Sequence, residues 1–274
     1  MSKFQKIYWS KKFDWKHYSK LYDKYCKSRN NYYIQSASEL LKSVKLKKNS
    51  KIVDMGCGTG ALTQQLLRKY PKISILGIDL SKEMLTYYRK NLLRQIKRGQ
   101  IKVVNRNAEQ IDRYTDEKYD TIFIASALWD MELELLFKNI SKILNKNGIV
   151  VFNLPALVVE KERGFIFFIE HFFRQTLNSK MIYRRIKLNH LKKLFRKYNF
   201  MPLSMKEYTF KMTKYNVAQF FNLLRYRYPF ILFPKEAPYD VKLKRCTEIF
   251  NESLRYIPKN GITEDGFVFM IKKK

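Results

Sequence analysis

Three glycines stand within five residues of the sequence, at the end of the segment Val53-Asp54-Met55-Gly56-Cys57-Gly58-Thr59-Gly60. The segment follows a β-branched run that predicts a strand, and it precedes residues 61–67, which predict a helix. Glycine allows a tight strand-to-helix turn and lets a ligand approach the main chain closely, and the amide groups of such a turn point outward. The spacing therefore predicts a binding site for the polar part of a cofactor.

A carboxylate at the end of the next predicted strand narrows the class of cofactor. Asp79, in Gly77-Ile78-Asp79-Leu80-Ser81, comes nineteen residues after Gly60. An acid at this distance holds ribose hydroxyls in dinucleotide-binding folds, so nicotinamide dinucleotides are one candidate. Two features favour another cofactor, since the turn reads GxGxG instead of GxGxxG and Asp54 precedes the first glycine. An anionic Asp54 suits a cofactor that carries a cation better than one that carries a pyrophosphate.

The elements that must position these residues read as a doubly wound α/β sheet. Strands are predicted at 51–55, 73–79, 101–104, 119–125 and 148–154, with right-handed connections through helices near 60–69, 82–97 and 131–145. Two helices are expected earlier, at 13–28 and 33–46, and one later, at 188–198. PLSMKEYTF and GFVFMIKK predict two further strands, separated by about sixty residues of helical and aromatic sequence.

At these residues the sequence resembles the class I S-adenosylmethionine-dependent methyltransferases, in particular the branch with the ubiquinone/menaquinone and malonyl-carrier-protein methyltransferases. The resemblance covers about residues 22–154. Its strongest parts are DMGCGTG and GIDLS; support comes from Leu21-Tyr22-Asp23, Met84-Leu85, Asn107-Ala108-Glu109, Tyr119-Asp120 and Leu144 with Asn147-Gly148. It implies S-adenosyl-L-methionine as cofactor and a mostly parallel, seven-stranded Rossmann-like sheet whose last strand runs antiparallel.

The resemblance also implies roles for single residues. Asp54 and the turn Gly56, Cys57, Gly58 and Gly60 would face the methionine part of the cofactor. Asp79, followed by Leu80, would hold the ribose, and Asn107 with the Ala108-Glu109 backbone would meet the adenine edge. Ala125 or Ser126 would lie near the sulfonium, and Tyr22 would close the pocket. Tyr22 is alternatively an ordinary packed aromatic, and Ser126 a cap of the following helix.

We expect a single methyltransferase domain over residues 1–274. Residues 1–48 would form N-terminal helices, 49–155 the cofactor-binding core, 156–187 and 211–264 lid insertions, and 188–210 and 265–274 the rest of the sheet. Ligands bind beyond the carboxyl ends of strands in open sheets, so both insertions are expected to roof the substrate site. Three interpretations of residues 164–174 are open: a helix of the core, a pocket wall for an apolar substrate, or a helix that lies on a membrane surface. A general base is needed only for a protonated nucleophile, and the candidates are a tyrosine or His171, which is the one candidate within the lid insertions.

The charge of the chain is its most unusual property. Lys and Arg number 55 against 24 acids, a net charge of +31, and the excess lies mainly outside residues 51–150. An AT-rich coding sequence explains such a lysine content without any function. A functional explanation is an anionic partner, such as an acidic acyl carrier protein, a membrane surface or RNA. The triplet Asn153-Leu154-Pro155 is similar to a base-methylation motif, but it closes the fifth predicted strand, where that motif closes the fourth.

These observations predict a methyltransferase that acts on a small, lipid-like or carrier-bound metabolite. The alternatives are an RNA methyltransferase that uses the basic flanks and a cofactor-binding partner protein without catalysis. Cys26, Cys57 and Cys246 lack metal-ligand spacing, and the three histidines form no pattern with them, so no metal is expected. Without an apolar run of about 18 residues or a hydrophobic leader, a cytoplasmic location with possible membrane association is expected.

Overall fold

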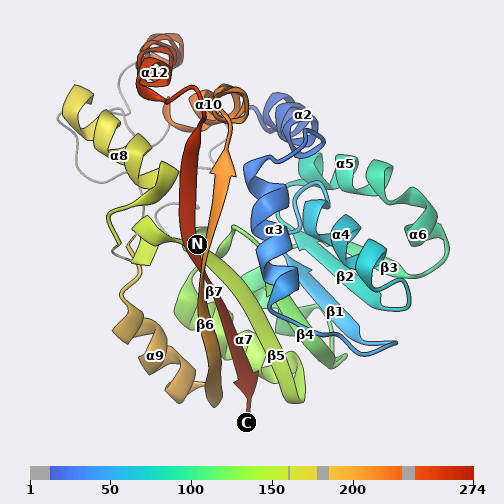
Figure 1. Ribbon diagram of the computed structural model, residues 1–274. Coiled ribbons are helices and arrows are strands. Elements are labelled where there is room, and N and C mark those ends of the chain that lie inside the picture. Colours follow the sequence, from blue (N-terminus) through green and yellow to red (C-terminus); the bar gives the residue numbers. More distant parts are fainter. Residues whose placement is uncertain (1–12, 160, 178–184, 230–237) are drawn as a thin grey trace.

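The computed structural model describes residues 13–159, 161–177, 185–229 and 238–274. Seven strands form one sheet in the order β3-β2-β1-β4-β5-β7-β6. β1 (Lys51–Met55), β2 (Ser74–Asp79), β3 (Ile101–Asn105), β4 (Tyr119–Ile124) and β5 (Leu144–Pro155) are parallel. β7 (Ile262–Lys273) runs antiparallel to both β5 and β6 (Phe200–Met212). The expected doubly wound sheet with an antiparallel last strand is therefore confirmed (Figure 1).

Alternating side chains of the strands bury two separate hydrophobic layers. In β1, Ile52 belongs to one core cluster and Val53 to the other, as the period of two in a strand requires. The first layer includes residues of α3 (Tyr32–Lys42), α4 (Ala61–Lys69) and α5 (Lys82–Asn91). The second includes residues of η1 (Ala108–Arg113), α7 (Leu133–Ile143) and α9 (Leu188–Lys197). Both faces of the sheet are covered, and the carboxyl ends of the parallel strands are left for a ligand.

Three predicted helices differ from the structure in their bounds. The helix predicted at 82–97 is two helices, α5 and α6 (Leu93–Lys97), because Leu92 leaves the helical conformation at φ −125°. The helix predicted at 131–145 ends at Ile143, because Leu144 already pairs with Tyr119 of β4. The helix predicted at 33–46 ends at Lys42, four residues earlier than expected. The other predicted elements agree with the observed bounds to within two residues or lie inside a longer strand.

A group of helices lies beyond the ends of β6 and β7 (Figure 1). It contains α8 (Gly164–Leu177), α10 (Lys214–Arg227) and α12 (Tyr239–Ser253), followed by η4 (Leu254–Tyr256). α10 contacts α12 and also α2 (Trp15–Cys26), while α8 contacts β7, α12 and η3 (Ala156–Val159). Segments 178–184 and 230–237 of the predicted lid insertions lie outside the described residues.

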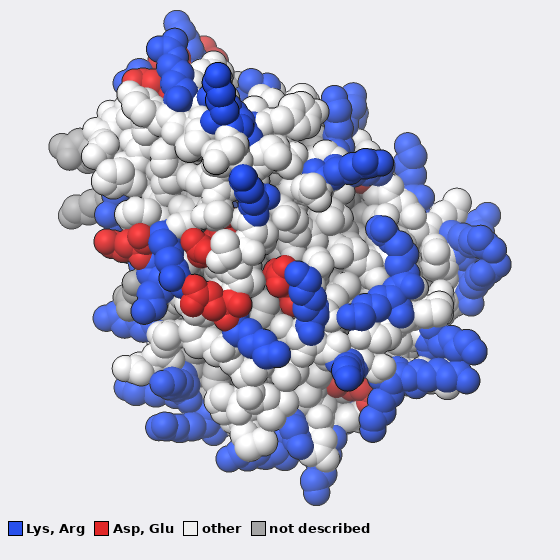
Figure 2. All heavy atoms as spheres, viewed as in Figure 1, with Lys and Arg blue, Asp and Glu red and all other residues white. Residues whose placement is uncertain are grey.

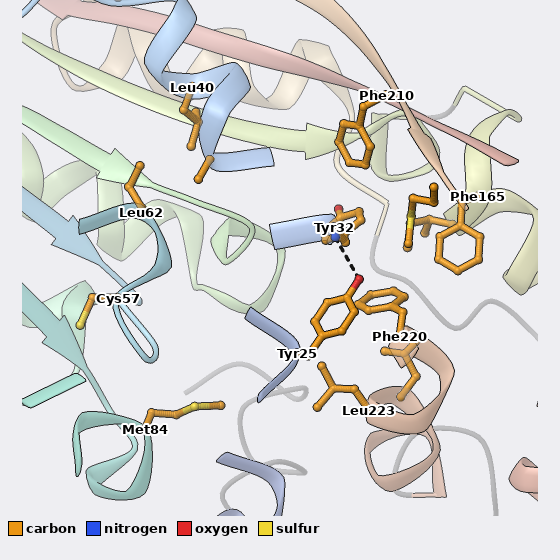
Figure 3. Packing of buried hydrophobic residues seen from close by; sticks show 14 of the residues in the cluster. Tyr25, Tyr32, Leu40, Cys57, Leu62, Met84, Phe165, Phe210, Phe220 and Leu223 are labelled. Atoms are coloured by element: carbon orange, nitrogen blue, oxygen red, sulfur yellow. Dashed lines mark hydrogen bonds between the residues drawn. The ribbon is translucent and has the colours of Figure 1, made fainter. Parts of the chain in front are cut away.

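Aromatic side chains join α10 to the N-terminal helices. Phe220 of α10 stacks on Tyr32 with ring centroids 5.2 Å apart and also contacts Tyr25, Tyr33 and Phe165. The Tyr25 hydroxyl accepts a hydrogen bond of 2.9 Å from the Tyr32 amide (Figure 3). Residues almost two hundred positions apart in the sequence thus form one packed layer over the sheet edge.

Candidate active site

One pocket of about 180 Å³ lies where β1, β2 and β4 end. Part of its lining comes from the loops that follow β1, β2, β3 and β4, and the rest comes from the N-terminal region, α5 and α10. The lining residues are Phe13, Trp15, Tyr18, Tyr22, Tyr33, Gly56, Gly58, Asp79, Leu80, Met84, Asn107, Ala108, Ser126, Ala127, Asp130, Met131 and Arg227. The pocket therefore has a wall built from the sheet and a wall built from the helices above it.

The glycine turn forms the floor of the pocket. Gly56 and Gly58 have φ of +69° and +54°, which residues with a side chain rarely adopt. A Cβ atom on Gly56 would stand 2.9 Å from the Cβ of Ala127, so the close approach of the two loops also requires glycine. The amides of Gly56 and Cys57 both donate to the carbonyl of Ile78 and anchor the turn to β2. The turn thus leaves bare main chain facing the pocket.

Asp79 joins the turn to the edge of the pocket. Its Oδ2 accepts a hydrogen bond of 2.9 Å from the Gly58 amide, and its Oδ1 accepts one of 2.8 Å from the Ser81 amide. Burial raises the pKa of this carboxyl, and the two amide bonds act in the opposite direction. Two fixed amides therefore hold the carboxylate at the pocket wall, in a position from which further hydroxyl donors can bind it.

The segment after β3 supplies the next part of the wall. Asn107 caps η1 by accepting a hydrogen bond of 3.0 Å from the Glu109 amide, and both Asn107 and Ala108 line the pocket. Glu109 is buried and turns away from the pocket, because its Oε1 accepts from the Glu132 amide at 2.8 Å. Glu109 thus ties this loop to the start of α7, while its neighbours face the pocket.

Ser126 reaches the pocket through a left-handed backbone conformation, with φ of +52°. The buried side chain of Asn153 holds it there, because Asn153 Oδ1 accepts from the Ser126 amide at 2.8 Å. The Asn153 amide nitrogen lies 3.3 Å from both the Ser126 hydroxyl and the Tyr208 hydroxyl. The Asn-Leu-Pro triplet of β5 therefore has a structural role, and it does not present its asparagine to a ligand.

Five aromatic side chains form the upper wall. A chain of ring contacts runs from Phe13 through Trp15 and Tyr18 to Tyr22 and Tyr33, with centroids between 4.6 and 6.1 Å apart. Tyr22 also lies over the glycine turn, 3.6 Å from the position of a Cβ on Gly58. Burial raises the pKa of Tyr18 to about 12 and raises the pKa of Tyr22 and Tyr33 as well. These phenols are therefore neutral at physiological pH.

An ion pair connects the two walls. Arg227, at the end of α10, donates through Nη2 to both carboxylate oxygens of Asp130 at 3.0 and 2.9 Å. Asp130 belongs to η2 (Leu128–Asp130), the short helix after β4. The side chains are 17% and 33% exposed, so the pair is only partly solvated. The ion pair ties the last turn of α10 to the short helix after β4, which belongs to the wall built from the sheet.

Five residues predicted to contact the cofactor do not line the pocket: Asp54, Cys57, Gly60, Glu109 and Ala125. Asp54 lies buried beneath the turn, and its Oδ2 accepts a hydrogen bond of 2.7 Å from the Thr63 hydroxyl of α4. Burial raises the pKa of Asp54 to about 7. Gly60 packs against α5 and its C-terminal end, where a Cβ would meet Leu92 at 2.9 Å. Asp54 and Gly60 therefore support the turn from the side of α4 and α5.

His171 lies on an exposed face of α8, 5.8 Å from the ring of Phe167, and is not among the residues that line the pocket. α8 buries Phe165, Ile169 and Phe173, which are spaced four residues apart and face the core. A residue two positions after Ile169 points about 200° away from that face, given 100° per residue. The structure therefore does not bring the predicted catalytic base to the pocket. Among the described residues of the predicted roof, Arg227 of the second insertion lines the pocket.

Sequence reasoning missed most of the upper wall and the ion pair. Phe13, Trp15, Tyr18 and Tyr33 belong to predicted helices but carry no motif. Their spacing gives a signal, because 15, 18 and 22 recur at the period of one helix face. The pairing of Asp130 with Arg227 spans 97 residues, and nothing in the local sequence indicates it.

Comparison with known proteins agrees with this geometry. Residues 52–148 match the model of a methyltransferase domain. The chain is 30% identical over 103 residues to malonyl-[acyl-carrier protein] O-methyltransferase of Legionella pneumophila, covering 37% of this chain and 35% of that protein. It is 30% identical over 145 residues to a probable S-adenosylmethionine-dependent methyltransferase of Saccharomyces cerevisiae, covering 53% and 46%. The matched segments thus span less than half of these relatives.

Residues 52–148 thus form a methyltransferase domain, and the chain resembles the class I S-adenosylmethionine-dependent methyltransferases. Its fold is shared by phosphoethanolamine N-methyltransferase 2 of Haemonchus contortus, solved with S-adenosylhomocysteine, at a TM-score of 0.58. The sequences are 16% identical, and the match covers all of this chain and 61% of that one. The cofactor of the methyltransferase is S-adenosylmethionine, and the bare glycine turn beside Asp79 fits the polar part of this nucleoside.

Two further observations on the described part of the chain concern metals and membranes. No group of three or more histidine, cysteine or acidic side chains there is arranged to hold a metal ion. None of its helices combines the length and the apolar character that crossing a bilayer requires.

Proposed function

We propose that the methyltransferase transfers the methyl group of S-adenosylmethionine to a carboxylate oxygen of a small or carrier-bound metabolite. The observation that carries the proposal is the composition of the pocket. It combines a nucleoside-binding floor with an aromatic wall and an arginine, and its described residues offer no side chain suited to removing a proton from the acceptor.

The residues of the floor would hold the cofactor. Asp79 would accept hydrogen bonds from the ribose hydroxyls, while Asn107 and Ala108 would contact the adenine and the turn at Gly56 and Gly58 the methionine part. The cofactor supplies an electrophilic methyl group on a sulfonium. The protein's task is then to align the acceptor with that methyl group and to exclude water, which the aromatic wall favours.

The lack of a base in the pocket lining supports a carboxylate acceptor. Among its described residues, the tyrosines hold their protons, Asp130 is engaged by Arg227, and Asp79 is engaged by two backbone amides. A carboxylate is already ionised at neutral pH, so its oxygen needs no base. In the transfer an oxygen–carbon bond forms while the carbon–sulfur bond breaks, and the charges of carboxylate and sulfonium cancel. An ester and S-adenosylhomocysteine result, and no proton moves.

Two observations support a carrier-bound acceptor. The Legionella relative is named for methylation of a malonyl group on an acyl carrier protein. A malonyl thioester has one free carboxyl group, which is ionised to a carboxylate at neutral pH. The net charge of +31 would attract an acidic carrier. On the face seen in Figure 2, Lys and Arg are spread widely instead of forming one patch, so the attraction would be long-range steering more than a single docking contact.

The test combines cofactor binding with a transfer assay. Calorimetry is expected to show micromolar binding of S-adenosylmethionine and S-adenosylhomocysteine and no binding of NAD. Radiolabelled cofactor is then supplied with malonyl-loaded acyl carrier protein, with the acetyl-loaded form as the control that lacks the carboxylate, and with total RNA. Label on the malonyl form alone supports the proposal. Label on RNA, with a steep loss of binding at higher salt, would replace it with RNA methylation, and cofactor binding with no labelled product on either acceptor would contradict it.

A further inference from the structure

The ion pair of Asp130 and Arg227 is placed where an acceptor must enter. Both side chains line the pocket, Asp130 from the loop after β4 and Arg227 from the last turn of α10. Ser126, Ala127 and Met131, close to Asp130 in the sequence, line the same pocket. The contact uses one guanidinium nitrogen against both carboxylate oxygens.

The charges around the pocket are few. Among the described lining residues Arg227 is the single basic side chain, and the acids are Asp79 and Asp130. The neighbouring wall consists of Phe13, Trp15 and three neutral tyrosines. An acceptor carboxylate that enters such a wall loses hydration, and this loss is costly unless a cation and hydrogen-bond donors replace the water.

Tyr18 belongs to the same electrostatic environment. Burial is the main cause of its raised pKa, and among charged groups Arg227, which lowers the pKa, and Asp130, which raises it, act on it most strongly; Tyr18 is also hydrogen-bonded to Tyr33. A phenol donor from α2 and a guanidinium from α10 therefore face the same part of the pocket. Together they resemble the donor set that binds a carboxylate in other proteins, a planar guanidinium with a neutral hydroxyl beside it.

We propose that Arg227 is the anchor of the acceptor's carboxylate, and that Asp130 occupies this anchor in the acceptor-free protein. The inference rests on the proposed function and deepens it by naming the group that recognises the acceptor. A carboxylate that enters the pocket takes the place of Asp130 on the guanidinium or shares the guanidinium with it. The bidentate geometry that planar guanidinium groups form with carboxylates then sets the orientation of the acceptor.

The opposite assignment is an outcome of the same experiment. If the acceptor were an amine, Asp130 would be its anchor and Arg227 would occupy that anchor in the acceptor-free protein. The aromatic wall by itself suits either case, because rings also bind cations. Removing one member of the pair at a time distinguishes the two.

The experiment measures binding to protein saturated with S-adenosylhomocysteine. The probes are the malonyl thioester of N-acetylcysteamine and the acetyl thioester, which lacks the carboxylate. Wild type is expected to bind the malonyl probe at least about tenfold more tightly. Arg227→Gln is expected to abolish this preference, and Arg227→Lys, which keeps the charge without the planar fork, to retain part of it. Asp130→Asn is expected to keep or strengthen binding, because it frees the anchor.

Arg225→Gln is the matched control, because it removes one positive charge from the same helix at a residue that does not line the pocket. Its preference for the malonyl probe should equal that of wild type. An unchanged dissociation constant for S-adenosylhomocysteine shows that each variant is folded. The proposal is overturned if wild type binds both probes equally, if Arg227→Gln keeps the preference, or if Asp130→Asn alone loses it.

Methyl transfer is measured separately, so the two proposals fail separately. Preference for the malonyl probe that depends on Arg227, without methylated product, would contradict the proposed function and keep the anchor. Methylated malonyl product with an unchanged preference in Arg227→Gln would keep the proposed function and contradict the anchor.

Discussion

The two walls of the pocket are built in different ways. The wall that we propose binds the cofactor, the cofactor wall, comes from one stretch, residues 56–131, and its geometry is set by local features such as positive φ at Gly56 and Gly58 and short loops after strands. The wall that we propose binds the acceptor, the acceptor wall, combines residues 13–33 with Arg227, and long-range packing brings them together. The first wall is part of the sheet and the second is docked onto it. The two walls should therefore respond differently to substitution.

The largest expected effect is on the docking of the acceptor wall. Phe220 is buried among Tyr25, Tyr32 and Phe165, and Phe220→Ala is expected to lower the free energy of unfolding by about 3–5 kcal/mol. Denaturant titration measures the loss, with the half-exposed Leu93→Ala as control. Hydrogen exchange should accelerate in α2, α3 and α10 while β1–β4 stay protected. Uniform acceleration would mean that the two walls are one cooperative unit.

The next effect is on the cofactor wall alone. Asp79→Ala removes the carboxylate that would hold the ribose and that also accepts from Gly58. We expect the dissociation constant of S-adenosylhomocysteine to rise about 100-fold, since charge-assisted hydrogen bonds are worth about 1.5–3 kcal/mol each. Calorimetry checks this, and Asp116→Ala, at an exposed acid, should bind like wild type. A change below about fivefold would remove Asp79 from the cofactor site.

A pH effect is expected from the carboxyl beneath the turn. The pKa of Asp54 is about 7 in the folded protein, so the group is half protonated near neutral pH. A bound sulfonium cation favours the ionised form and lowers this pKa, so binding releases a proton and strengthens as pH rises through about 7. The affinity ratio of S-adenosylmethionine to S-adenosylhomocysteine should rise about tenfold for each unit by which the pKa falls.

Calorimetry of both ligands over a pH range of about 5.5 to 8.5, which extends to both sides of the Asp54 pKa, measures this ratio. Asp54→Asn is the control, because it keeps the shape of the side chain and removes the titration. The affinity ratio of this variant should not depend on pH if Asp54 is the titrating group. Asp79, whose pKa burial also raises, is the other buried carboxyl at the turn. A pH-dependent ratio in Asp54→Asn, or a flat ratio in wild type, would assign the effect elsewhere or remove it.

The smallest effect is expected when a residue of the acceptor wall is substituted and the affinity for the cofactor product is measured. Tyr18→Phe keeps the ring and removes a hydroxyl that faces Arg227 and Tyr33. The dissociation constant of S-adenosylhomocysteine should change by less than about threefold, which corresponds to less free energy than a typical hydrogen bond contributes. Tyr215→Phe, at an exposed residue of α10, is the matched control. A tenfold loss in Tyr18→Phe would show that the two walls do not act separately.

The sequence predicted more of the cofactor wall than of the acceptor wall, and the reason is physical. The strands, the turn and the position of Asp79 follow from β-branched runs and glycine spacing, which are local. The family resemblance added Asn107 and Ser126. The direction of a single side chain is less local. Asp54 lies beneath the turn, bonded to Thr63, and no motif distinguishes that from facing the cofactor. His171 is the exception, because the periodicity of Phe165, Ile169 and Phe173 already places it on the solvent side of α8.

The sequence alone determined the cofactor, the order of strands and helices, and the edge of the sheet where the ligand binds, because these depend on contacts between residues near in sequence. Tertiary structure decided what covers that edge. Arg227 meets Asp130, and Phe220 meets Tyr32, only because α10 folds back over the N-terminal helices. Such pairings form because the folded chain buries an aromatic layer. Hydrophobic burial does not depend on how far apart two residues are in the sequence, so no local pattern indicates them.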